Sequence, residues 1–148
     1  MMIRLAPLLL LLPLSFPSLA ANTEQAVQIS DNWVRATAPG QEVGAGYMTL
    51  LSKKDTTLVS VESNAADSVE IHSMTMENGV MKMRSLKELP LKANQPEKLE
   101  PGSFHLMLFD LKKPLKAGEK VEFKLNFKDG KGKSSALNIS SPIKASKD

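Results

Sequence analysis

Alternation of apolar and polar residues is the feature that most limits the folds open to this chain. The clearest case is residues 121–127, where Val121, Phe123, Leu125 and Phe127 are separated by single polar residues. A period of two sends all four apolar side chains to one side of a β-strand, and that side must be buried. No segment after residue 20 shows an apolar repeat of 3.6 over the length of a helix.

Similar short runs recur along the chain between turn residues, at intervals of roughly 8–12 residues. We therefore expect an all-β fold with a single domain, a two-sheet β-sandwich or a small barrel. Residues 53–55 are expected to form the hairpin loop that joins two of these strands. The expected strands are residues 27–29, 33–36, 44–51, 57–61, 103–109, 121–127 and 136–140.

The first 20 residues are expected to be a signal peptide rather than part of the fold. Arg4 precedes an apolar run at 8–12, and Ser18-Leu19-Ala20 supplies a small-residue cleavage site. Prolines interrupt the apolar stretch, which also falls short of the roughly 20 residues of a membrane-spanning helix. We expect removal of residues 1–20, no membrane anchor, and a periplasmic domain formed by residues 21–148.

Composition excludes several classes of function. The chain has no cysteine, which rules out disulfide scaffolds, zinc ribbons and thiol catalysis. Seven aromatic residues and a 42% hydrophobic share argue against a membrane bundle and against a single-stranded nucleic-acid binder. Residues 21–110 carry a net charge of −4 and residues 111–148 carry +6. The basic segment is either a set of solvated lysines or a docking face for an acidic partner or membrane.

The dipeptide Asn78-Gly79 predicts a tight β-hairpin, because both residues tolerate the positive φ angles of a two-residue turn. Counting outward from that turn sets Met76 opposite Met81, Met74 opposite Met83 and His72 opposite Ser85. One face of the hairpin would then present an imidazole and four thioethers. His72 and Met83 would be diagonal neighbours on it, about 7–8 Å apart at the backbone.

A second strand, residues 103–109, follows the turn dipeptide Pro101-Gly102. Period two sends Phe104, Leu106 and Leu108 to the core and leaves His105 and Met107 together on the opposite face. His72 and His105 are the only histidines of the chain, and five of the six methionines that follow residue 20 fall within residues 72–107.

Each of these residues alone has an ordinary structural reading. A single strand histidine is usually solvated or hydrogen-bonded, and methionines commonly fill irregular gaps in a core or form a flexible contact patch. The combination favours metal binding. Thioether sulfur suits Cu(I) and contributes little to Zn²⁺, Ca²⁺ or Mg²⁺. Without a cysteine thiolate, a blue-copper electron carrier is excluded.

The spacing His72-x10-Met83-x21-His105-x-Met107, with the stretch Pro-Gly-x-x-His-x-Met-Leu, resembles the periplasmic PCu(A)C-type copper chaperones. The resemblance runs from about residue 33 to residue 127. It implies a cupredoxin-like Greek-key β-sandwich that binds one Cu(I) per chain through His72, Met83, His105 and Met107. Many members have methionine directly after the first histidine. This chain has Ser73 there, which leaves Met74 as a substitute donor. Residues 140–148 lack the His- and Met-rich tail of some members.

The resemblance also implies a partner, a copper acceptor such as the copper site of a cytochrome c oxidase subunit, alongside a Sco-type protein. We expect a monomer that does not bind nucleic acid. We also expect that the protein is not an enzyme, since two histidines with no organised Ser, Cys or carboxylate partner form no acid–base pair or triad. Two alternatives use the same sequence features. One is a periplasmic copper-storage or resistance protein, and the other is a metal-free β-sandwich interaction module.

Overall fold

The computed structural model describes residues 26–145, and the expected signal peptide at residues 1–20 lies outside that range. Within it the chain forms strands and no helix, so the all-β prediction is confirmed. No helix that could cross a membrane is therefore present between residues 26 and 145. The strands are β1 (Val27–Arg35), β2 (Gly44–Ser52), β3 (Thr56–Ser63), β4 (Ala66–Glu77), β5 (Val80–Leu86), β6 (Leu89–Leu91), β7 (Glu97–Leu99), β8 (His105–Leu111), β9 (Lys120–Asp129) and β10 (Ser134–Lys144).

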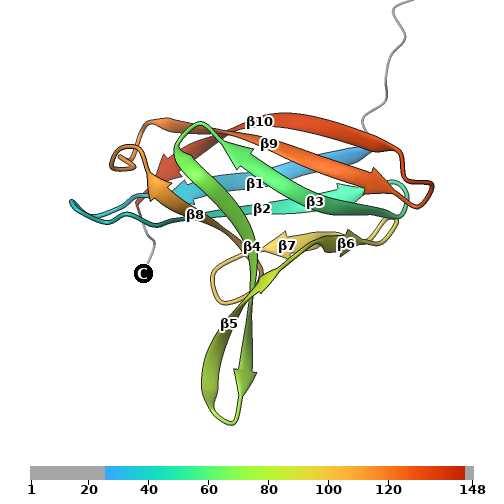
Figure 1. Cartoon of the computed structure of the whole chain (residues 1–148), viewed down its shortest axis with the longest axis horizontal. Coiled ribbons are helices and arrows are strands. Elements are labelled where there is room, and N and C mark those ends of the chain that lie inside the picture. The colour runs from blue at the N-terminus through green and yellow to red at the C-terminus, as the bar shows by residue number, and fades with distance from the viewer. Residues whose placement is uncertain (1–25, 146–148) are drawn as a thin grey trace, which may run out of the picture.

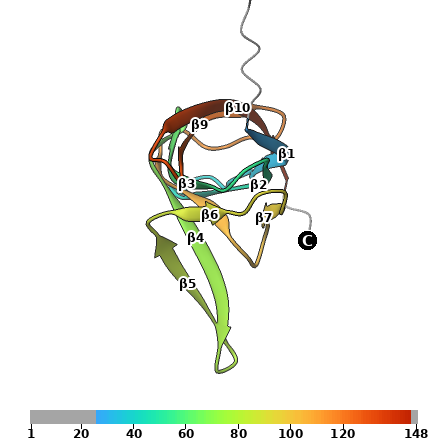
Figure 2. The ribbon, with the colours of Figure 1, turned by 90° about the vertical axis from the view of Figure 1, so that its right-hand side faces the viewer.

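Seven of the strands close into a barrel. Figures 1 and 2 show this barrel from two sides. The hydrogen-bonded order is β4-β8-β2-β1-β10-β9-β3, and a pairing of β3 with β4 at Val61 and Val69 completes the circuit. β1 and β10 run parallel, and the other neighbours on this path are antiparallel. Two of these contacts are short, with two residue pairs between β1 and β10 and one between β3 and β4.

The barrel interior holds the core that the alternating pattern predicted. In β9 the four apolar residues at 121, 123, 125 and 127 are each at most 2% exposed, and the polar residues between them point outward. Leu106 and Leu108 of β8 are fully buried in the same core. Burial of each such side chain contributes roughly 1.5–3 kcal/mol, so packing alone can hold this cysteine-free domain together.

The prediction that residues 53–55 form a hairpin loop between two paired strands is wrong. β2 pairs with β1, β7 and β8, whereas β3 pairs with β4, β6 and β9, so the two strands lie in different parts of the wall. Residues 53–55 cross between them, and the Asp55 carboxylate accepts a hydrogen bond from the backbone N–H of Ala93. Turn residues show where a strand stops, but they do not determine which strand the next one will pair with.

β4 and β5 form a hairpin that projects from the barrel, as Figure 1 shows. The first half of β4 pairs with β8, from Ala66 to His72, while the second half pairs only with β5. The predicted register is confirmed: Glu77 lies opposite Val80, and the pairs continue inward without a bulge. Asn78 and Gly79 have φ angles of 51° and 76°, as the two-residue turn requires.

We expect Gly79→Ala to loosen the tip of this hairpin. A Cβ at Gly79 would meet no atom within 4 Å, so the cost is conformational, about 1–2 kcal/mol for an L-residue in the left-handed region. Amide hydrogen exchange in residues 74–83 should accelerate roughly 5–30-fold, with the barrel unchanged. Gly130→Ala is the matched control, because Gly130 also faces open space but does not have a positive φ. Equal exchange in both variants would contradict the prediction.

Candidate metal centre

Strand pairing brings the two histidines side by side. His72 of β4 lies directly opposite His105 of β8, and their ring centroids are 5.6 Å apart. In the same register Met107 faces Glu70, and on the other edge of β4 Met74 faces Met83. Residues directly opposite in an antiparallel pair share a face. All four predicted ligands therefore lie on one face of three adjacent strands.

This face is the outer side of the barrel wall, at the point where the hairpin leaves it. The opposite side of the same strands carries Ile71, Leu106 and Leu108, which are core residues. The imidazoles are buried nevertheless, with His72 8% and His105 4% exposed, whereas Met83 is 45% exposed. The site thus combines two buried imidazoles with the exposed thioether side chain of Met83. His72, His105 and Met107 lie on the barrel wall, and Met83 lies next to them on β5 of the projecting hairpin.

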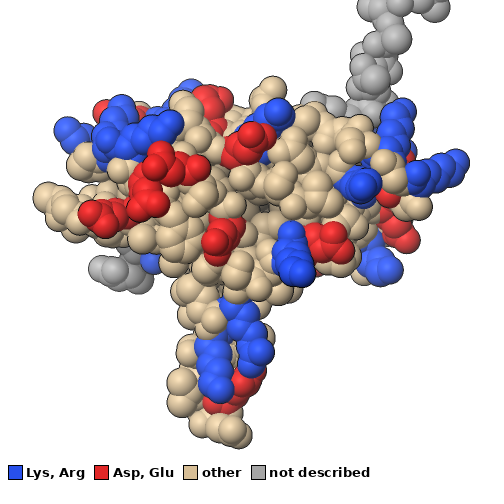
Figure 3. All heavy atoms as spheres, in the orientation of Figure 1, with Lys and Arg blue, Asp and Glu red and all other residues tan. Residues whose placement is uncertain are grey.

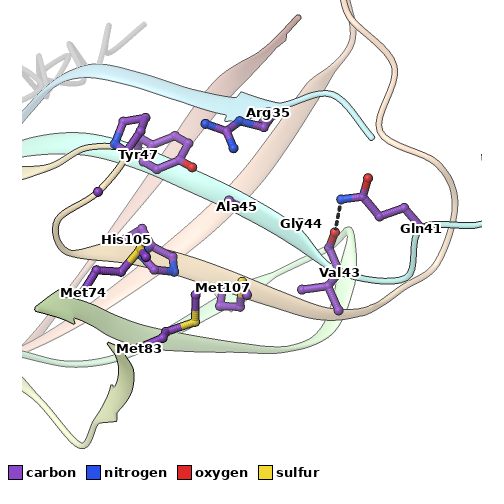
Figure 4. Close-up of a pocket in the computed structure, with 12 residues that line it drawn as sticks. Arg35, Gln41, Val43, Gly44, Ala45, Tyr47, Met74, Met83, His105 and Met107 are labelled. Carbon is purple, nitrogen blue, oxygen red and sulfur yellow. Dashed lines mark hydrogen bonds between the residues drawn. The ribbon is translucent and has the colours of Figure 1, made fainter. Parts of the chain in front are cut away.

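A cavity of about 340 Å³ opens on this face. Three of the four predicted ligands line it, together with Met74, while His72 lies beside His105 and does not contribute to the lining. Figure 4 shows the thioethers and the imidazole gathered along one side of the cavity, with an arginine and a tyrosine across from them. The residues concerned are Met74, Met83, His105 and Met107 on one side and Arg35 and Tyr47 on the other.

The surroundings of His105 favour the neutral form of its ring. Its Nδ1–H donates to the carbonyl oxygen of Ser103 at 3.3 Å, because a carbonyl can only accept. The lone pair of Nε2 is then left for another partner. Burial lowers the pKa of His105, and the positive charge of Arg35 acts in the same direction, so the ring is neutral at pH 7. A carbonyl on the far nitrogen of a ligating histidine fixes the tautomer that a metal needs.

The two ring nitrogens of His72 have different surroundings. Its Nε2–H donates to the carboxylate of Glu70 at 2.8 Å, and hydrogen bonds from His72 and Ser85 lower the pKa of Glu70. The ring packs against His105 and Phe109. Nδ1 is buried and has no hydrogen-bond partner among the described residues. An orphaned buried acceptor is costly unless something binds it, and a metal ion is one such partner.

The site contains polar and aromatic residues that the sequence did not reveal. The guanidinium of Arg35 lies over the Tyr47 ring at 5.5 Å, and that ring packs against Trp33 at 4.6 Å. Burial raises the pKa of Tyr47. No local pattern links these residues of β1 and β2 to the histidines. Glu70 could have been found, because it precedes His72 by two residues and so shares its face.

Carboxylates and imidazoles alone do not supply a metal site. Among residues 26–145 no three side chains of the types His, Asp and Glu lie close enough to hold an ion together. The donors gathered at the cavity are imidazole and thioether, which fit a soft monovalent cation.

Sequence comparisons identify the family. A model of the family described as "Putative lipoprotein LpqE-like" matches residues 27–139. The chain belongs to the LpqE-like family. "Putative lipoprotein Lxx21020" of Leifsonia xyli subsp. xyli is 33% identical over 119 residues, which span 80% of this chain and 69% of that protein. The LpqE-like chain is also 32% identical over 113 residues to "Uncharacterized protein RP573" of Rickettsia prowazekii, and spans 62% of its length.

Solved structures confirm the fold that the family resemblance implied. The solution structure of CuI-DR1885 from Deinococcus radiodurans has a TM-score of 0.61 and 30% identity, covering 82% of this LpqE-like chain and 81% of that one. The apo PCuAC domain from PmoF1 has a TM-score of 0.65 at 24% identity, over 82% of this chain and 95% of that domain. The resemblance to the PCu(A)C-type proteins and the cupredoxin-like fold are thereby confirmed. The two faces of the expected sandwich are joined into a closed barrel.

Proposed function

We propose that this LpqE-like protein is a periplasmic copper chaperone that binds one Cu(I) ion through His72, Met83, His105 and Met107. The observation that carries the proposal is a pair of adjacent, buried imidazoles beside a cavity lined by methionine sulfur, one of them with an Nδ1 that has no hydrogen-bond partner among residues 26–145. On this proposal residues 1–20 are a signal peptide, and residues 21–148 form the copper-carrying domain.

The choice of metal follows from the donors. Two neutral imidazoles and two neutral thioethers bring no negative charge to the ion, so they favour a monovalent soft cation over a divalent hard one. Thioethers also bind without losing a proton and cannot be consumed by disulfide formation. The solution structure of the Deinococcus radiodurans relative, at 30% identity, is described as its CuI form, which supports the same metal here.

Transfer needs an accessible ligand, and Met83 provides one. Met83 is 45% exposed, so a donor on an acceptor protein can reach the ion from this side while the imidazoles still hold it. We propose exchange of one ligand at a time, with no covalent or redox chemistry and no enzymatic activity. The acceptor proposed from the family resemblance is the copper site of cytochrome c oxidase, alongside a Sco-type protein. We expect a monomer in this role.

Competition against a Cu(I) chelator tests the binding site. The wild-type protein should bind one equivalent at the cavity, and Met107→Leu and Met83→Leu should each weaken that binding by about 10-fold or more, since each removes one donor and keeps the volume. Met48→Leu is the matched control, because Met48 is a core thioether with 1% exposure and lies outside the cavity. Unchanged affinity in both cavity variants would defeat the proposal.

Delivery is tested separately from binding. The copper-loaded protein, mixed with the metal-free copper domain of a cytochrome c oxidase subunit, should metallate that domain, as measured by the copper content of the two proteins after they are separated. If copper stays on the donor while the chelator still removes it, the protein stores copper and does not deliver it.

A further inference from the structure

The projecting hairpin has two chemically different faces. Alternation along β4 and β5 places Ser73, Thr75 and Glu77 on one face, where Val80, Lys82 and Arg84 lie opposite them. The other face carries only methionines beyond the histidine. Met74 lies directly opposite Met83, and Met76 directly opposite Met81. We call these two pairs the inner and outer methionine pairs.

The charged face carries ion pairs between the two strands of the hairpin. Glu77 makes ion pairs with Arg84 at 2.7 Å and with Lys82 at 3.1 Å, and the Asn-Gly turn fixes the tip. Figure 3 shows basic and acidic side chains grouped along the hairpin. Ion pairs of this kind contribute little singly, but they cross-link the two strands without any help from the methionines. The sulfur atoms are therefore free to bind something else.

Packing does not account for these methionines. Met76 is 64% exposed, Met81 43% and Met83 45%, and the described residues contain one other large hydrophobic side chain with comparable exposure, Val80 of the same hairpin. Methionine also forms flexible contact patches. Here the methionines are paired directly across the two strands, the inner pair borders the cavity with His105, and each side chain carries a soft donor.

The two pairs lead toward the candidate metal centre. Residues directly opposite on one face have Cβ atoms about 4.5–5.5 Å apart, so the thioethers of Met76 and Met81 can meet around one ion. The inner pair lies two residues closer to the barrel, about 7 Å along the strands. Met74 and Met83 both line the cavity with His105. Sulfur donors thus extend from the tip of the hairpin to the imidazoles.

We propose that the outer methionine pair is a second, weaker Cu(I) site, which takes up the ion first and passes it through the inner pair to the histidines. This inference rests on the function proposed above, since it describes how the same centre is loaded. The ion stays monovalent throughout, and each step replaces one neutral donor by another, a thioether within the hairpin and an imidazole at the last step. The outer site is weaker because its only donors are two exposed thioethers, without an imidazole.

Methionine methyl NMR with Ag(I), a redox-inert soft cation, tests the proposal, and Cu(I) under anaerobic conditions repeats it. The first equivalent should shift the methyl signals of Met83 and Met107, and the second those of Met76 and Met81. The double variant Met76→Leu with Met81→Leu should bind one equivalent instead of two and load more slowly. Val80→Leu is the matched control, because it changes an exposed apolar residue on the charged face and should keep two equivalents.

The proposal is overturned if the Met76 and Met81 signals of the wild-type protein stay in place at excess metal, or if the double variant still binds two equivalents. The first result would leave the methionine face as a docking surface for a protein. A His105→Ala sample separates this outcome from failure of the proposed function. If that variant keeps the first equivalent while the outer pair still responds, the histidine site is wrong and the outer site stands. If the variant loses the first equivalent and the Met76 and Met81 signals do not shift, the histidine site stands and the outer site is wrong.

Discussion

Replacement of His105 by alanine is expected to weaken Cu(I) binding by about 100-fold or more. Loss of an outer-shell partner of a ligand typically costs 10–100-fold in metal affinity, and His105 is proposed as a ligand itself. Its Nε2 is unprotonated at neutral pH because Nδ1–H is committed to Ser103, and burial lowers the pKa of the ring. No other imidazole can take its place, since His72 is the one remaining histidine of the chain.

Competition against a Cu(I) chelator at pH 7 measures the effect, with circular dichroism to confirm that the variant is folded. His105→Gln serves as a second variant because it retains most of the side-chain volume at this buried position. Both variants should lose affinity to a similar extent if the ring nitrogen is the donor. Retained affinity in the glutamine variant would mean that alanine acted through a cavity, and the assignment of His105 as a ligand would be wrong.

Leu106→Ala is expected to lower the free energy of unfolding by about 2–5 kcal/mol, a large share of the stability of a domain this size. Leu106 is fully buried in the barrel core and lies between His105 and Met107 in β8. Its loss leaves a cavity behind the strand that supplies two of the proposed ligands. The same strand therefore links the stability of the core to the geometry of the metal centre.

Urea denaturation of the metal-free protein measures this change as a lower midpoint at an unchanged slope. Val80→Ala, at a residue that is 58% exposed on the hairpin, is the control and should stay within about 0.5 kcal/mol of wild type. Excess Cu(I) should restore part of the lost stability, because a ligand that binds only the folded state stabilises it by mass action. A shift below 1 kcal/mol for Leu106→Ala would contradict the packing described here.

Local patterns in the sequence determined the strands and much of the candidate site. Period-two alternation predicted the buried face of β9, and it separated Leu106 and Leu108 from His105 and Met107 in β8. The Asn78-Gly79 turn determined the hairpin register, and so the pairing of Met74 with Met83. These predictions hold because side-chain direction and turn geometry depend on neighbouring residues only.

Tertiary structure alone decided which strands lie side by side. The pairing of β4 with β8 sets His72 opposite His105, and it also buries both rings. The placement of Arg35 and Tyr47 across the cavity, and the crossing at residues 53–55, likewise depend on the closure of the barrel. Pairing between segments distant in sequence is selected by the free energy of the whole packed fold, since many registers satisfy the same local alternation.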